Sequence, residues 1–278
     1  MPSEARARAA RSLAELSVLV HALTSEVASL QEDTWQKLEV ARGQELNSEI
    51  ADFLCSLQNL LNDLSGAIRE KSRSAAAQFQ YLGKIGLHVG CRGDIIPDWI
   101  NTDAECGDIQ LNLLYELPFP NGAFELIYCS HTLEHFYYPS EVEFVLSELR
   151  RVLKPGGTIR IVVPDLEPLV GAYVAGDIAY FEARRKFAPI PYFAQTMLED
   201  FLHYAGAGPA PGSGLQSHKF GFDFETLALL LKRCGFSSVV RSRYQGSNDP
   251  RLLVDTYSRS IARSGDMKHL SLFVEATT

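Results

Sequence analysis

The chain has 278 residues, a net charge of −8, 46% hydrophobic residues and 22% charged residues, which is enough apolar sequence to bury a core without metal or disulfide staples. The negative field disfavours long duplex nucleic acid as a partner, and no apolar run approaches the roughly 20 residues that span a bilayer. The five cysteines form no C-x-x-C pair, so we expect a cytoplasmic protein without a zinc knuckle.

Residues 1–80 are predicted to form a helical extension, because apolar residues recur at steps of three and four over residues 13–30 and again over residues 50–68. The two amphipathic helices form either a coiled-coil arm that pairs two copies of the chain or a hairpin that packs on the main domain. Both alternatives stay open, because each stripe is shorter than the three to four heptads that indicate a coiled coil.

From residue 81 to residue 278, short apolar strands alternate with helical segments, which predicts an α/β domain with a doubly wound, mostly parallel, Rossmann-like sheet. Residues 166–217 interrupt this rhythm and are expected to form a helical lid. A turn at 154–157 is expected to separate the first helix from the next strand. The expected strands are 86–89, 99–102, 125–129, 158–163 and 271–276, and the expected helices are 141–153 and 224–234.

Ligands of open parallel sheets bind beyond the carboxyl ends of the strands. The turn Gly90–Gly93 follows the first strand, and its glycines let the backbone pass close to a cofactor. Asp103 ends the second strand, where a carboxylate can accept hydrogen bonds from both hydroxyls of a ribose. A glycine turn followed by a distant aspartate is a weak signal when taken alone.

Four downstream segments strengthen the signal from the glycine turn and Asp103. In their order along the chain they resemble class I S-adenosylmethionine-dependent methyltransferases, close to the bacterial type-11 group. The segments are Leu117–Gly122, Phe124–Ile127, Ser130–His135 and Arg151–Gly157. The resemblance covers about residues 84–165 and continues more weakly to the last strand. It implies S-adenosylmethionine as cofactor and methyl transfer to an oxygen, nitrogen or carbon atom of a small-molecule or glycan acceptor.

The cofactor-binding residues that the resemblance implies are Gly90, Cys91, Arg92, Gly93, Asp103, Asn112, Leu113 and Ser130. The glycine turn borders the methionine end, Asp103 holds the ribose, and Asn112 with Leu113 borders the adenine. His131 and Asp165 are the candidate catalytic residues, acting as bases if the acceptor must lose a proton. For both residues a structural role is an equal alternative: His131 as a turn residue and Asp165 as a helix N-cap.

Two positions depart from the family pattern. Arg92 stands where relatives usually carry glycine, and His88 stands where they favour an acidic residue. Either the guanidinium of Arg92 pairs with the carboxylate of the cofactor, or the site is impaired. In the second case the chain is a catalytically inactive interaction protein with a methyltransferase fold.

The segment His131–His135 also reads H-x-x-E-H, a zinc-peptidase pattern. Because it follows a strand and opens a helix, His131 is expected in the turn, where it cannot join His135 on one helical face. A zinc-dependent hydrolase is therefore a remote alternative, and we expect no metal.

Overall fold

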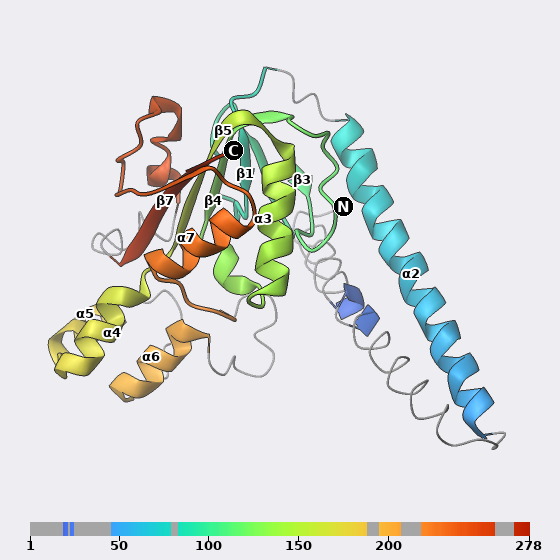
Figure 1. Cartoon of the computed structure of the whole chain (residues 1–278), viewed down its shortest axis with the longest axis horizontal. Helices are drawn as coiled ribbons and strands as arrows, with labels where there is room; N and C mark the ends of the chain where they lie inside the picture. The colour runs from blue at the N-terminus through green and yellow to red at the C-terminus, as the bar shows by residue number, and fades with distance from the viewer. Residues whose placement is uncertain are drawn as a thin grey trace, which may run out of the picture.

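The computed structural model describes residues 19–21, 23–24, 46–78, 83–187, 195–206, 218–258 and 270–278. Its centre is a seven-stranded sheet in the order β3-β2-β1-β4-β5-β7-β6 (Figure 1). The strands are β1 (Leu87–Val89), β2 (Ile100–Asp103), β3 (Ile109–Gln110), β4 (Phe124–Ser130), β5 (Leu153–Pro164), β6 (Ser238–Arg241) and β7 (Ser271–Thr277). The pairs among β1 to β5 are parallel, whereas β7 runs antiparallel to β5 and β6. The predicted Rossmann-like α/β sheet is confirmed.

The central strands are buried because their side chains are apolar on both faces, as expected for a parallel sheet covered by helices. All three residues of β1 are buried, and Leu87 lies in register with Ile100 of β2 and Ile127 of β4. Helices α3 (Ser140–Val152) and α7 (Phe224–Arg233) lie in front of the sheet in Figure 1. Their buried aliphatic stripes complete the main core.

Three short helices follow the carboxyl end of β5 and form a separate projection (Figure 1). They are α4 (Leu166–Ala175), α5 (Ile178–Phe187) and α6 (Met197–Ala205), all within the segment predicted as a helical lid. Leu169, Phe181 and Tyr204 form the centre of a small core of their own. The projection therefore has its own packing and lies at the sheet edge where ligands of this fold class bind.

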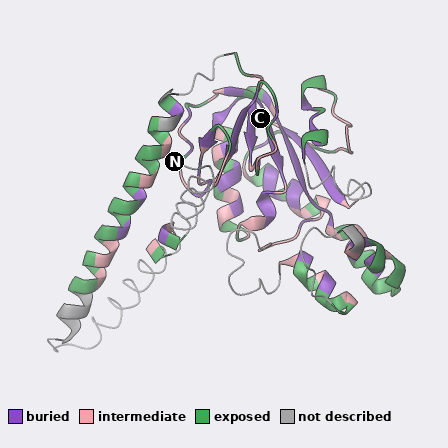
Figure 2. Ribbon diagram, turned by 180° about the vertical axis from the view of Figure 1, so that it is seen from behind, coloured by how far each residue is buried: buried purple, intermediate pink, exposed green. Residues whose placement is uncertain are grey.

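Helix α2 (Leu46–Gln78) is a single helix of 33 residues, about 50 Å long at the usual rise of 1.5 Å per residue. It passes the β3 edge of the sheet and extends well beyond it (Figures 1 and 2). Near its end Ala76 joins the main core, and the Ser72 hydroxyl donates to the Gln110 carbonyl at 3.4 Å. Further from the sheet, Val20 packs on Leu61. Part of the extension thus packs on the main domain, and most of the predicted stripe 13–30 lies outside the described residues.

The predicted boundary before β5 is wrong. Residues 154–157 were expected to form a turn, but β5 already begins at Leu153, which pairs with Phe124. The pairing is irregular between Phe124 and Leu126, and Gly156 has a φ of +75°. The two glycines of the predicted turn are therefore part of β5, in its irregularly paired first residues.

Among the helices of the described residues, none is long and apolar enough to cross a membrane.

Candidate functional site

The turn after β1 is built from left-handed backbone. Gly90, Arg92 and Gly93 have φ angles of +69°, +46° and +81°. A Cβ atom at Gly90 would overlap the hydroxyl of Thr132, so the close approach of the two segments requires glycine there. Arg92 adopts the backbone conformation that glycine favours, and its side chain is exposed. The arginine therefore fits the turn at the cost of a strained φ.

Asp103 ties the end of β2 to this turn. One carboxylate oxygen, Oδ2, accepts from the backbone N–H of Arg92 at 2.9 Å, and Oδ1 accepts from that of Glu105 at 2.9 Å. These two bonds fix the orientation of the carboxylate beside the turn. Because each oxygen has a second lone pair, the side chain can still accept from a pair of hydroxyl groups.

The segment after β3 contributes a half-buried amide and an apolar side chain. The Oδ1 atom of Asn112 accepts from the backbone N–H of Leu114 at 2.9 Å, which closes a local turn. Leu113 is buried beside it. Both residues lie at the same carboxyl edge of the sheet as Asp103, since β3 runs parallel to β2.

Ser130 and His131 lie where β4 ends. Ser130 is buried, and its hydroxyl donates to that of Ser258 at 3.4 Å. His131 has a φ of +49°, and its backbone N–H donates to Val162 of β5 at 2.7 Å. The Nε2 atom of its ring lies 3.3 Å from the Ser271 hydroxyl. The imidazole is thus held at the carboxyl edge and remains 17% exposed.

Asp165 follows β5 and caps α4. Its Oδ1 atom accepts from the backbone N–H of Glu167, and its Oδ2 atom forms an ion pair with Arg241 at 2.8 Å. Burial raises the pKa of this carboxyl, although the bonds to Glu167 and Arg241 oppose the rise. Both oxygens are engaged, which fits the N-cap alternative; whether the carboxylate also reaches an acceptor stays a prediction.

A second group of polar residues meets behind His131. Glu134 is 1% exposed, and the Nδ1 atom of His131 lies 3.3 Å from its Oε1 atom. The carbonyl of Glu134 accepts from the backbone N–H groups of Lys219 at 2.7 Å and Phe220 at 3.3 Å. These two bonds bring His218 against Glu134 and His135. Sequence reasoning did not connect His218 with this group, because no spacing pattern links it to a motif about eighty residues earlier.

The charges of this group follow from its burial. Burial opposes ionisation of Glu134, but the contact with His131 and the neighbouring imidazoles hold its pKa at about 2. Burial lowers the pKa of His218 to about 4, so this imidazole is neutral at physiological pH. The group therefore combines a carboxylate with a neutral imidazole in a water-poor place.

Two thiols lie beside Asp103. Cys91 is buried within the turn, and ligand atoms of Cys91, Asp103 and Cys106 lie within 4.8 Å of one another. The contact with Cys106 and burial raise the pKa of the Cys91 thiol, and the same contact lowers that of Cys106. Sequence reasoning selected Cys91 but not Cys106, although Cys106 comes three positions after Asp103.

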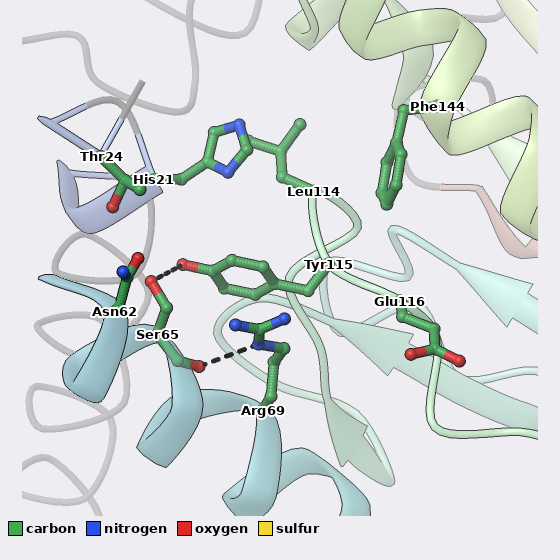
Figure 3. A pocket seen from close by; sticks show the side chains of 9 residues that line it. All are labelled: His21, Thr24, Asn62, Ser65, Arg69, Leu114, Tyr115, Glu116 and Phe144. Carbon is green, nitrogen blue, oxygen red and sulfur yellow. Dashed lines mark hydrogen bonds between the residues drawn. The ribbon is translucent and has the colours of Figure 1, made fainter. Parts of the chain in front are cut away.

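A cavity of about 310 Å³ lies between the extension and the loop after β3 (Figure 3). The ring of Tyr115 crosses it toward α2, where its hydroxyl lies 3.5 Å from the Ser65 hydroxyl. Arg69 donates to the Ser65 carbonyl at 3.3 Å, and its guanidinium lies 5.6 Å from the centre of the Tyr115 ring. The extension thus contacts the loop that begins at Asn112.

Residues 38–161 match the family model described as "Methyltransferase domain". This part of the chain is thus similar to methyltransferase domains. The match begins inside the helical extension and includes the glycine turn, Asp103 and the segment after β4. The methyltransferase resemblance predicted from the sequence is confirmed, while the individual site residues stay predictions.

Two curated relatives align over short stretches. A probable methyltransferase of Aspergillus luteorubrus is 42% identical over 48 residues, which are 17% of this chain and 17% of the relative. An uncharacterized protein of Methanocaldococcus jannaschii is 34% identical over 73 residues, which are 26% of this chain and 30% of that protein. The aligned part thus spans less than a third of each relative's own length.

Solved structures give a distant likeness. An S-adenosylmethionine-dependent methyltransferase of Archaeoglobus fulgidus is 17% identical, with 74% of this chain and 95% of that chain covered and a TM-score of 0.37. A possible histamine N-methyltransferase of Thermotoga maritima is 14% identical, with 74% and 87% covered and a TM-score of 0.36. Scores at this level carry no conclusion about substrate.

Proposed function

We propose that the chain transfers the methyl group of S-adenosylmethionine to an oxygen, nitrogen or carbon nucleophile of a small-molecule or glycan acceptor. The observation that carries the proposal is the hydrogen bond between the Gly90–Gly93 turn and the carboxylate of Asp103. It lies at β1, beside the point where the order of the parallel strands reverses and where ligands of such sheets bind. The family match supports the same reaction.

The residues at this edge fit such a cofactor. The glycine turn brings the backbone at Gly90 against Thr132, in the segment that follows β4. Asp103 is already fixed by two backbone N–H groups and keeps lone pairs for the ribose hydroxyls. Asn112 and Leu113 offer an amide and an apolar surface for the adenine. The cofactor supplies an activated methyl group on a sulfonium, so orientation of the acceptor and exclusion of water supply much of the catalysis.

His131 is the better supported candidate for a base. Its ring lies at the carboxyl end of β4 between the Ser271 hydroxyl and the carboxylate of Glu134. This arrangement orients the ring as a buried acid orients a catalytic histidine. Asp165 is less suited, because both of its oxygens already bind Glu167 and Arg241.

Calorimetric titration with S-adenosylhomocysteine tests the proposal. We expect micromolar binding by the wild-type chain and a loss of at least about tenfold in the Asp103→Ala variant, since hydrogen bonds to a charged group are removed. Asp63→Ala, on the exposed face of α2, is the matched control and should bind like the wild type. If the wild type does not bind, the proposal fails and the inactive interaction protein becomes the better interpretation.

Pairing of two copies through the extension also remains a proposal. Phe53, Leu60 and Leu64 of α2 are exposed and offer an apolar surface to a second copy. Sedimentation of the wild type and of a Leu60→Glu variant tests it. A dimer that dissociates in the variant supports pairing, whereas a monomeric wild type contradicts it.

A further inference from the structure

Three potential metal ligands from two distant segments converge behind the end of β4. Glu134 and His135 belong to the short helix η1 (Leu133–His135), and His218 comes from the segment before α7. One ligand atom from each side chain lies within 4.8 Å of the other two. The bond from the Lys219 N–H to the Glu134 carbonyl holds the two segments together.

Polar atoms in this group are buried and unsatisfied. The Oε2 atom of Glu134 has no hydrogen-bond partner among the described residues, and the Oε1 atom has the Nδ1 atom of His131 at 3.3 Å. The Nδ1 atom of His218 is also buried without a hydrogen-bond partner in the described part of the chain. Buried charged and polar groups are normally paired or bind a metal, because burial without a partner is unfavourable. A cation between the carboxylate and the imidazoles would satisfy these atoms together.

We propose that Glu134, His135 and His218 bind a divalent transition-metal ion, with zinc as the best-suited ion. Imidazole and carboxylate ligands suit zinc and its neighbours in the first transition row, whereas magnesium prefers oxygen ligands alone. Ligand bonds of about 2.1 Å in a tetrahedral site place the ligand atoms about 3.4 Å apart, so modest side-chain movements close the site. Three protein ligands leave a fourth position for water.

The ion would join the end of β4 to the segment that leads into α7. His131 lies beside the site rather than within the converging set, since its Nδ1 atom faces Glu134 and its Nε2 atom faces Ser271. A carboxylate that binds the metal through one oxygen can hold His131 through the other, which is a common arrangement around metal sites. This proposal does not depend on methyl transfer.

A second cluster of potential metal ligands, which contains two cysteines, is the main alternative to this metal site. Cys91, Asp103 and Cys106 also converge within 4.8 Å, and thiolates bind zinc strongly. Cys91 belongs to the proposed cofactor turn, however, and Asp103 is already fixed by two backbone bonds. The test must therefore distinguish nitrogen and oxygen ligands from sulfur ligands.

The experiment uses the full chain without a histidine tag. The metal-free protein is titrated with Zn²⁺, and bound metal is counted by elemental analysis after gel filtration. We expect stoichiometric zinc, with affinity reduced at least about tenfold in Glu134→Gln and His218→Ala, because even loss of groups that only orient ligands costs this much. His21→Ala and Cys106→Ser are the matched controls and should bind like the wild type.

Substitution with Co²⁺ gives a readout that does not depend on the folding of any variant. Visible d–d bands without a thiolate-to-cobalt charge-transfer band would support the imidazole and carboxylate ligands. A charge-transfer band, or loss of binding in Cys106→Ser alone, would overturn the proposal in favour of the thiols. A wild-type chain that retains no zinc would also overturn it.

Discussion

Arg160 and Asp255 form a fully buried ion pair, in which Nε and Nη2 of the guanidinium donate to the two carboxylate oxygens at 2.9 and 2.7 Å. The same guanidinium donates to Glu275 of β7 at 2.8 Å and to the Arg243 carbonyl at 2.7 Å. One side chain of β5 therefore holds β7 and the loop after β6 in place.

Replacement of Arg160 by methionine should lower the free energy of unfolding by about 3–5 kcal/mol, because it leaves the buried carboxylate of Asp255 without a charged partner, with the backbone N–H of Gln245 still donating to it. Urea unfolding followed by circular dichroism measures the change. The control is Arg251→Met, since the ion pairs of Arg251 with Asp249 and Glu125 are exposed to solvent. Equal losses in the two variants would contradict the importance of burial.

Acid should destabilise the fold through His88. Burial lowers the pKa of His88 to about 4, and its Nδ1 atom lies 3.1 Å from Oδ1 of Asn101. The unfolded chain takes up this proton near its ordinary pKa of about 6.5, whereas the folded chain does not. The stability that this group contributes is complete above pH 6.5 and is lost as the pH falls toward 4, by about 3 kcal/mol.

Unfolding measured between pH 7 and pH 4 in the wild type and in His88→Gln isolates this group, because glutamine does not titrate. The wild type should lose more stability than the variant over this range. Parallel pH curves for the two chains would show that His88 is not the group responsible.

Gly90 should tolerate no side chain while Thr132 is present. Gly90→Ala places a Cβ atom against the Thr132 hydroxyl and on a left-handed backbone, so we expect a loss of at least about 1–2 kcal/mol and weaker binding of S-adenosylhomocysteine. Thr132→Ala should recover part of the stability, with a coupling energy of about 1 kcal/mol in a double-mutant cycle. Gly171→Ala, inside α4 where nothing lies within 4 Å, is the control and should be neutral or stabilising. Additive losses would contradict the steric explanation.

Arg92→Gly separates the two roles of this arginine. Glycine relieves the left-handed strain, so stability should rise by up to about 1 kcal/mol. If the guanidinium pairs with the carboxylate of the cofactor, affinity for S-adenosylhomocysteine should fall about tenfold, as measured by calorimetry. Binding that appears only in the variant would instead identify the wild type as an inactive relative.

The central sheet could be predicted because its strands are short apolar runs separated by turn residues. β1, β2, β4 and β7 lie within one or two residues of their predicted positions. β3 and β6 gave no signal: β3 has only two residues, and β6 is largely exposed. Strands of this kind owe their pairing to neighbours in space, which a local pattern does not contain.

In the candidate site, too, some contacts could be predicted from the sequence and others could not. Asp103 could be placed beside Gly90–Gly93 because both follow adjacent parallel strands, and the structure joins them through a hydrogen bond. The approach of His218 to Glu134 could not be predicted, because it depends on backbone bonds across a segment without regular spacing. No spacing pattern groups Cys106 with Cys91 either, and only the fold brings the two thiols together.

The position of β7 has a consequence for folding. β7 lies between β5 and β6 and is hydrogen-bonded to both, yet it follows β6 by about thirty residues in the chain. During synthesis on the ribosome, the apolar edge of β5 therefore stays open until residues 271–277 emerge. An open strand edge is a template for association with other chains, and pairing over long sequence distances is slow. Chaperone binding to the nascent protein should thus be strongest just before β7 emerges.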